Sequence, residues 1–566
     1  MLTKESALLL AVGMMVVFLS EIRFASTGRA MRPKIHVWIC TAVFLTGCLL
    51  RLWALSGLPS GISAEEALVG VQAKSLWQTG GFLGGGLTTQ FTQWTGETSG
   101  PLLAVMTAPF VGLGGLTPLM VRMPLALISC GAIAAAYGLG KRLGGARMAR
   151  WVMIVYAICP YFVLTARLTS GINLAVSLLP VALYALLVGL RHTAWLYVGM
   201  ILTGLLAYTH DLYFFISPAL VLWVAVLAVR KGRKWGHVFC AAVLAEAICL
   251  PGILTLMVNL DGGEGYSFLG LIDIPKLENY IRAGGLMEKH SEGMRMVLPA
   301  MQKIWAVLTG GVFQFVMHVY MNNDLFTPDG MLALYFVSLP LIALGALVVL
   351  TRLLKAERCV QDCAAEWLLV LGGFAVTFAT LIFYGSEGTM NPTGCTSVWD
   401  DATLFVFTAL LMAIGLCRLE RRSFAGLVAM SFLLCANVGM LGMHLLGGMY
   451  EKNANVFLNG WKEAVMRAEE VREETGGTVY VTDGVWPHVA PEEAAEILYL
   501  YAADAELRNP AENSGHEIAH MEDLSRLDER AIYLLRYNET REWMDVSHRS
   551  EAFEEFALYL PKVEAL

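Results

Sequence analysis

Two adjacent glutamates, Glu65 and Glu66, are the residues of this sequence best suited to chemistry. They lie in the stretch Leu58–Ala67 (LPSGISAEEA), shortly after a long apolar segment. A carboxylate at the boundary between water and lipid is partly desolvated, which makes it a stronger base and suits it to general-base catalysis. The same residues also fit a helix start, with Ser63 as the N-cap and Glu66 completing a capping box. The residues alone leave both interpretations open.

A second ionisable pair, His210 and Asp211, lies in a tight turn (AYTHDLYFF) between two apolar segments. Ionisable side chains near a membrane usually face a cavity, where this pair could contact an acceptor molecule. A hydrated turn is the alternative interpretation.

The segment His516–His520 (HEIAH) matches the H-E-x-x-H pattern of zinc proteases. That site requires a helix, because helical spacing brings both histidines onto one face. The flanking residues offer little apolar surface to bury such a helix. We therefore favour a non-catalytic interpretation and keep a metalloprotease tail as the weakest hypothesis.

The composition indicates a membrane protein. Of 566 residues, 56% are hydrophobic and 15% are charged, against roughly a quarter charged in soluble domains. This excludes a soluble enzyme, a disordered scaffold and a nucleic-acid binder. Residues 1–450 carry 29 Lys+Arg and 22 Asp+Glu, a net charge of +7, whereas residues 451–566 carry 11 and 25, a net charge of −14. A basic membrane body is therefore joined to an acidic, water-soluble tail.

Hydropathy and basic clusters together predict about 12 transmembrane helices, at roughly 20 apolar residues each. The predicted helices lie at 7–20, 35–56, 118–140, 151–166, 174–190, 194–209, 212–229, 235–254, 331–351, 366–383, 402–417 and 424–446. With this assignment every Lys and Arg cluster falls on the cytoplasmic face, and both termini lie outside. The short apolar run 101–113 is interpreted as interfacial or re-entrant.

Three regions follow from this assignment. Residues 1–34 form a short membrane helix and a basic linker, and residues 35–447 form the membrane domain, with an external loop at 57–117. Residues 448–566 form a small extracytoplasmic α/β domain. In it, 461–475 and 491–503 have helix patterns, and 478–483 and 531–537 have strand patterns.

The order of short motifs along the chain resembles the GT-C glycosyltransferases, in particular the family 39-like branch that includes protein mannosyltransferases and the aminoarabinose transferase of lipid A. The motifs are Glu65-Glu66 after the first long helix, Gly100-Pro101, Arg122-Met123-Pro124, Thr165-Ala166-Arg167 and Asn391-Pro392. Asn391-Pro392 and the acidic tail resemble the firmicute-type members. Glu65 stands where the family has Asp, and no lysine accompanies Gly100-Pro101.

The resemblance implies an all-α, GT-C-like membrane enzyme that takes a sugar from a polyprenyl-phosphate donor, a glycosyltransferase of hexosyltransferase type. Glu65 is the expected base, with Glu66 as its helper or acceptor anchor. The anionic lipid phosphate requires cations, and Arg167, Arg122 and Lys74 are the candidates. His210, Asp211 and Asn391 are the candidate acceptor or cavity residues.

The expected partners are this donor, a glycan, lipid or protein acceptor, and the bilayer, with no nucleic acid. No cofactor is required by the residues, and a divalent metal ion is left open. The alternative hypothesis is a transporter of a polyprenyl-linked glycan, which would use the same cavity without breaking a bond and would not need Glu65.

Overall fold

The computed structural model describes residues 33–59, 61–83, 86–92, 98–260, 264–277, 332–355, 364–384, 398–420, 460–482, 497–502, 516–519, 530–536, 548–554 and 556–562. All structural statements concern these residues. The predicted helices at 7–20 and 424–446, together with Asn391 and His520, lie outside them.

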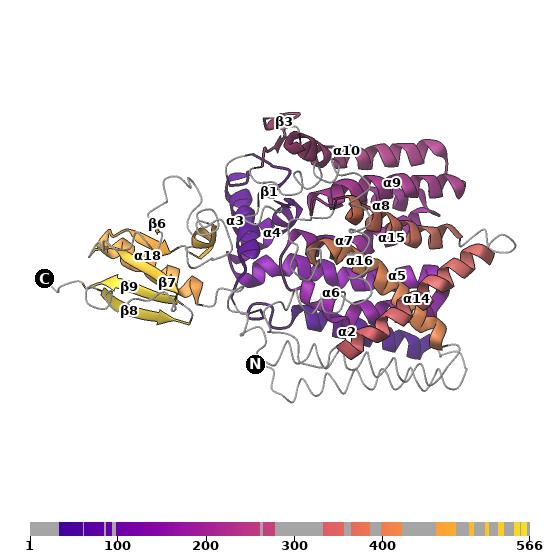
Figure 1. Ribbon diagram of the computed structural model, residues 1–566, viewed down its shortest axis with the longest axis horizontal. Coiled ribbons are helices and arrows are strands. Elements are labelled where there is room, and N and C mark those ends of the chain that lie inside the picture. The colour runs from indigo at the N-terminus through magenta and orange to yellow at the C-terminus, as the bar shows by residue number, and fades with distance from the viewer. Residues whose placement is uncertain are drawn as a thin grey trace.

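The membrane domain is a bundle of helices that run side by side (Figure 1). The members are α2 (Pro33–Leu52), α5 (Pro118–Ile158), α7 (Gly171–Gly189), α8 (Thr193–Leu205), α9 (Tyr213–Arg230), α10 (Trp235–Leu260), α14 (Leu332–Lys355), α15 (Ala364–Tyr384) and α16 (Val398–Glu420). Among the described residues, α2, α5, α7, α9, α10 and α16 are long and apolar enough to cross a membrane. The helices predicted within the described residues are present, with ends that differ by a few residues, except that the one at 151–166 is divided at Cys159 between α5 and a separate short helix.

Helix α5 covers two predicted spans and is broken between them. Gly144 and Gly145 leave helical geometry, and Gly145 has φ +81°, a conformation that glycine adopts without strain. The two halves pack closely, since a Cβ on Gly140 would lie 2.7 Å from the backbone of Ala149. A short helix, α6 (Pro160–Thr165), follows.

Two helices of the predicted external loop (57–117), α3 (Ala64–Thr79) and α4 (Leu102–Gly114), lie at one end of the bundle, and α3 runs across it (Figure 1). Between them β1 (Phe91–Thr92) pairs with β2 (Thr98–Ser99). A second hairpin joins β3 (Tyr266–Phe268) and β4 (Ile272–Ile274) after α10. Helix α4 has 13 residues, so the apolar run 101–113 is helical but short for a membrane span.

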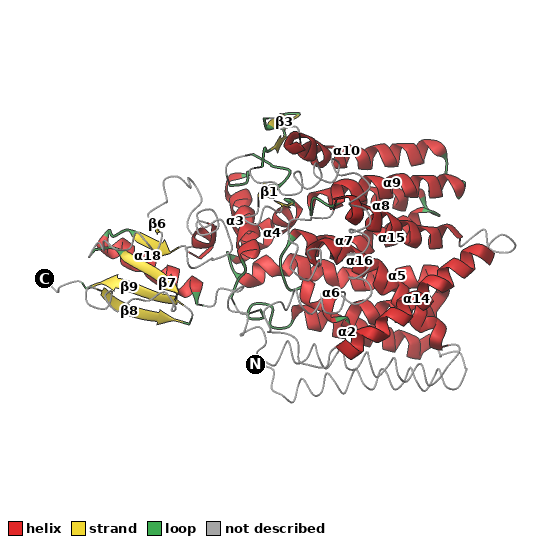
Figure 2. Cartoon of the chain, viewed as in Figure 1, coloured by secondary structure: helices red, strands yellow, loops and turns green. Residues whose placement is uncertain are grey.

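The C-terminal domain contains a five-stranded sheet, shown in yellow in Figure 2. Its strand order is β6-β5-β7-β9-β8, and its strands are β5 (Val479–Thr482), β6 (His516–Ala519), β7 (Ile532–Arg536), β8 (His548–Phe553) and β9 (Phe556–Pro561). Strand β5 runs parallel to β6 and β7, whereas β9 runs antiparallel to β7 and β8. Helix α18 (Trp461–Thr475) packs its apolar side on this sheet. The predicted helix and strand at 461–475 and 478–483 are confirmed.

The H-E-x-x-H pattern falls on a strand. His516–Ala519 forms β6, which pairs in parallel with β5. A zinc protease requires a helix here, because only helical spacing brings both histidines of the pattern onto one face, and His516–Ala519 is extended. The metalloprotease hypothesis therefore lacks its structural basis.

The C-terminal domain packs directly on α3 and the loop after α4. Its core is continuous with that of α3, and a Cβ on Gly70 would lie 3.2 Å from the Tyr501 ring. Lys462 donates a hydrogen bond of 3.1 Å to the carbonyl of Leu116 and lies over the Tyr501 ring. The tail therefore supports the external loop.

Candidate functional site

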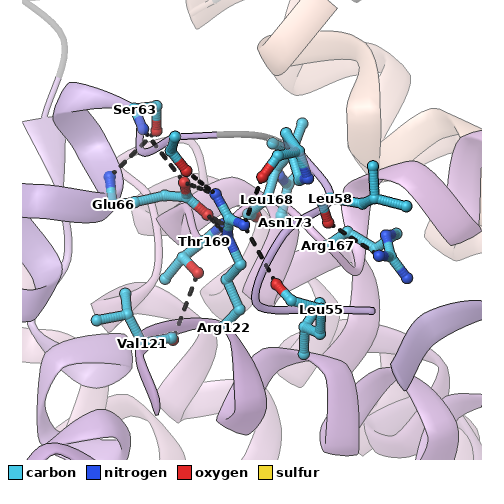
Figure 3. A network of polar contacts seen from close by, with 12 residues as sticks. Leu55, Leu58, Ser63, Glu66, Val121, Arg122, Arg167, Leu168, Thr169 and Asn173 are labelled. Atoms are coloured by element: carbon cyan, nitrogen blue, oxygen red, sulfur yellow. Dashed lines mark hydrogen bonds and ion pairs between the residues drawn. The ribbon is translucent and has the colours of Figure 1, made fainter. Parts of the chain in front are cut away.

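The centre of the external loop is a buried ion pair between Glu66 and Arg122 (Figure 3). The Nε and Nη2 atoms of Arg122 donate to the two carboxylate oxygens of Glu66, at 2.8 Å each, and neither side chain is exposed to solvent. This is the two-pronged geometry in which a guanidinium binds a carboxylate most strongly. The pair fixes the first turn of α3 against α5.

The Glu66 carboxylate accepts two further hydrogen bonds from main-chain amides. The N–H of Ser63 donates to Oε2 at 3.2 Å, and the hydroxyl of Ser63 accepts from the N–H of Glu66, which completes the predicted capping box. The N–H of Thr169 donates to Oε1 at 3.1 Å. Glu66 thus joins α3, α5 and the segment before α7.

Arg122 also binds the chain that leads from α2 to α3. Its guanidinium donates to the carbonyls of Leu55, Pro59 and Gly61, at 3.2, 2.9 and 2.8 Å. These bonds satisfy carbonyls of an irregular, partly buried segment, and leaving buried carbonyls without a partner would be costly. One arginine therefore holds both ends of the Leu58–Ala67 stretch.

Arg167 makes a similar set of bonds at the end of α2. It donates to the carbonyls of Leu50, Arg51, Trp53, Ala54 and Leu58, at distances from 2.8 to 3.4 Å, and is fully buried. The last carbonyls of a helix have no partner within the helix, and a cation near them is stabilising. Arg167 caps α2 and anchors the start of the external loop, as Figure 3 shows for Leu58.

Glu65 differs from its neighbour. It occupies the first turn of α3, one residue before Glu66, and its side chain is partly exposed. Consecutive helical residues point about 100° apart, so the Glu65 side chain leaves the helix in a different direction from the buried pair. The sequence placed these two acids together, and the structure separates their environments.

The remaining candidates occupy different surroundings. Lys74 is half-buried on α3, nine residues beyond Glu65, which corresponds to ~13 Å along the helix axis. His210 and Asp211 are buried, with His210 Nδ1 and Asp211 Oδ1 2.9 Å apart. The hydrated turn considered for this pair is therefore wrong. The pair forms part of the protein interior.

The turn that carries His210 packs against the external loop. The N–H of Gly100 donates to the carbonyl of Thr209 at 3.0 Å. The main chains of Ser99 and His210 form an isolated antiparallel β-bridge. A Cβ on Gly100 would lie 2.0 Å from the Tyr208 carbonyl oxygen. Glycine in the Gly100-Pro101 motif is therefore required by close backbone contact.

The described residues offer a poor site for a metal ion. They contain no group of three or more His, Cys, Asp or Glu side chains that could hold one. Both oxygens of Glu66 are bound to Arg122.

Two residues of this network were not anticipated from the sequence. Arg51 is fully buried and binds Ser129 Oγ at 2.8 Å and the carbonyls of Gly47, Tyr156 and Ala157. Thr169 contributes only its main-chain N–H to Glu66. The role of Arg51 could have been predicted, because it is an arginine at the end of an apolar run. The role of Thr169 could not, because a main-chain N–H donor does not depend on the residue type.

Comparison with known proteins identifies the fold. No family model and no curated protein sequence matches this chain. The structure is similar to that of ArnT from Cupriavidus metallidurans bound to undecaprenyl phosphate, with 12% identity over 93% of this chain and 97% of that chain and a TM-score of 0.51. The apo state of ArnT gives the same identity and coverage with a TM-score of 0.50. The archaeal oligosaccharyltransferase AglB from Archaeoglobus fulgidus matches 83% of this chain and 63% of its own, with 13% identity and a TM-score of 0.46.

At such low identity the likeness to ArnT defines the fold. The chain is a helical membrane protein with the GT-C fold and a C-terminal α/β domain, as the order of its motifs predicted.

Proposed function

We propose that this protein is a membrane glycosyltransferase that moves a sugar from a polyprenyl-phosphate donor to an acceptor hydroxyl at the external face. The observation that carries the proposal is the separation of two adjacent carboxylates. Glu66 is buried in an ion pair that fixes the loop, and Glu65 is partly exposed beside it. The GT-C fold supports the donor class, because ArnT with this fold was crystallised with undecaprenyl phosphate.

The proposed reaction is one displacement at the anomeric carbon. The acceptor oxygen forms a bond to that carbon while the bond from the carbon to the phosphate oxygen breaks. The acceptor proton passes to the Glu65 carboxylate, and the polyprenyl phosphate leaves with the bonding electron pair. A carboxylate base is suited to this step because it is ionised at neutral pH and accepts one proton.

Glu65 is the proposed base because its side chain is partly exposed, whereas that of Glu66 is buried in an ion pair. Glu66 accepts hydrogen bonds from Arg122, Ser63 and Thr169, so proton transfer to it would weaken a buried ion pair. Glu65 lies in the first turn of α3 and its side chain is partly exposed. We therefore assign Glu66 to positioning of the base.

The arginines are assigned to the same positioning role. Arg122 and Arg167 would have to release several main-chain carbonyls to reach a lipid phosphate. Lys74 is a weak candidate for the phosphate, because nine residues of helix place its side chain about 180° around α3 from Glu65 and ~13 Å along the axis. His210 and Asp211 are buried, so we propose no direct contact between these two side chains and the acceptor.

The first experiment is native mass spectrometry of the purified protein with undecaprenyl phosphate carrying a panel of sugars, followed by a transfer assay. Glu65→Gln is expected to retain the donor and lose transfer by ~10²–10⁴-fold, the usual contribution of a general base. Glu463→Gln on the exposed side of α18 is the matched control and is expected to retain transfer.

Full transfer by Glu65→Gln would remove this residue as the base. A wild-type protein that binds the charged lipids but transfers no sugar would favour a carrier transporter. A protein that binds none of them would contradict the donor class.

A further inference from the structure

A polar cavity lies between α5, α14 and α16. It has a volume of about 170 Å³, well above the ~30 Å³ that one water molecule occupies in the liquid. Its wall includes Gly144 and Met148 of α5, Thr351 and Arg352 of α14, and Arg418 of α16. Three helices that are distant in sequence therefore line one small, half-open site with two arginines.

This cavity is remote from the Glu66–Arg122 pair. Arg122 and Gly144 are 22 residues apart on the first half of α5, or ~33 Å along a continuous helix. The hydrocarbon core of a bilayer is ~30 Å thick. Helices α14 and α16 end on the side of the bundle away from the C-terminal sheet (Figure 1). The cavity therefore lies at the opposite membrane boundary from the external loop.

The two arginines make the cavity suitable for binding an anion. Arg418 is half-buried and Arg352 is exposed at the rim, where its guanidinium lies 4.9 Å from the centre of the Trp367 ring. Stacking on an aromatic ring restricts the guanidinium without using its N–H donors. Two guanidinium groups with fixed forks match the oxygens of a phosphate better than a single lysine does.

The break in α5 adds main-chain donors. Gly144 and Gly145 interrupt the helix, so the following segment begins a new helix whose first turn contains Met148. The first N–H groups of a helix have no acceptor within it, and they carry the positive end of the helix dipole. The first half of α5 ends at the same break, and its negative end opposes this effect, so the two arginines supply the main attraction for an anion.

Ordinary explanations account for each arginine separately. A basic residue in the last turn of a helix is stabilised by the dipole, and a long side chain at a membrane boundary reaches toward water. Neither effect explains why Arg352 and Arg418, from different helices, line one cavity together with the helix start after Gly145.

We propose that this cavity binds a phosphate group, carried by the headgroup of an anionic membrane lipid. A soluble phosphate compound offers the same group, but the position of the cavity at a membrane boundary favours a lipid. The bound headgroup connects the ends of α14 and α16 to the break in α5. This inference does not depend on the proposed transferase activity.

The test compares lipid retention by the full-length protein in detergent. The purified protein is freed of lipid, mixed with phosphatidylglycerol or phosphatidylcholine, and analysed by native mass spectrometry. Arg352→Gln/Arg418→Gln is the test variant, and Arg230→Gln/Lys234→Gln is the control, because it removes two exposed charges near the same membrane boundary. Arg352→Lys/Arg418→Lys keeps both positive charges and is used as the test variant if the Gln variant does not fold.

We expect selective retention of phosphatidylglycerol, a loss of about tenfold or more in the Gln test variant, and no change in the control. The Lys variant is expected to retain an intermediate amount. Equal retention by the test and control variants would overturn the proposal. Displacement of the lipid by millimolar inorganic phosphate would identify a soluble phosphate as the ligand and refute the lipid assignment.

Discussion

Arg122 provides the sharpest test of the site, because two roles predict different results. In the structure it makes five hydrogen bonds, two to Glu66 and three to main-chain carbonyls. Arg122→Met removes all five and leaves the Glu66 carboxylate buried. Breaking a buried ion pair from one side typically costs about 3–5 kcal/mol. We therefore expect a fall of several degrees in the apparent Tm, measured by tryptophan fluorescence in detergent.

A double-mutant cycle separates the ion pair from the other bonds of Arg122. Glu66→Gln removes the charge and keeps one oxygen, which can accept from the N–H of either Ser63 or Thr169, because these two amides bind different oxygens of the carboxylate. The double variant Glu66→Gln/Arg122→Met is expected to be less destabilised than the sum of the two single variants, by about 0.5–3 kcal/mol. If the two single-variant losses of stability simply add, the ion pair contributes little to the stability of the loop.

The transfer assay distinguishes two roles of Arg122, positioning of the loop and binding of the donor phosphate. A lysine at position 122 keeps one charge but cannot bind both carboxylate oxygens and three carbonyls. If Arg122 holds the loop, Arg122→Lys lowers both the apparent Tm and kcat. An unchanged Tm with a raised KM for the donor would refute this reasoning and return Arg122 to the phosphate site.

Three further predictions follow from packing. Arg51→Met should lower the free energy of unfolding by about 2 kcal/mol or more, since it removes four buried hydrogen bonds to a charged group. Gly100→Ala should reduce stability by about 1–3 kcal/mol and impair transfer, because its Cβ collides with the Tyr208 carbonyl. Tyr501→Ala should loosen the C-terminal domain on α3 by about 3 kcal/mol, measured as faster hydrogen exchange near Gly70.

Each of these predictions has a control. Arg230→Met removes an exposed arginine and should leave the apparent Tm unchanged, in contrast to Arg51→Met. Gly131→Ala adds a Cβ into open space on α5 and should retain stability and transfer. Met466→Ala on the exposed side of α18 should leave hydrogen exchange at α3 unaltered. If a test variant behaves like its control, the corresponding contact does not stabilise the protein.

The local features of this protein were predictable from the sequence because they depend on neighbours within a few residues. Apolar runs of the right length identified the membrane helices, and charge patterning identified α18. The capping box of Ser63 and Glu66 followed from a spacing of three residues. The GT-C fold was predictable from the order of motifs, although each motif is short.

The partners within the site were decided by the tertiary structure. Glu66 and Arg122 are 56 residues apart, and no local rule selects this arginine over Arg167 as the partner of the carboxylate. The zinc-like pattern shows the same limit, because His516–Ala519 became a strand through parallel pairing with β5, a distant segment. The sequence thus determined which residues could act. Long-range packing decided that one glutamate is held in a buried ion pair while its neighbour stays partly exposed.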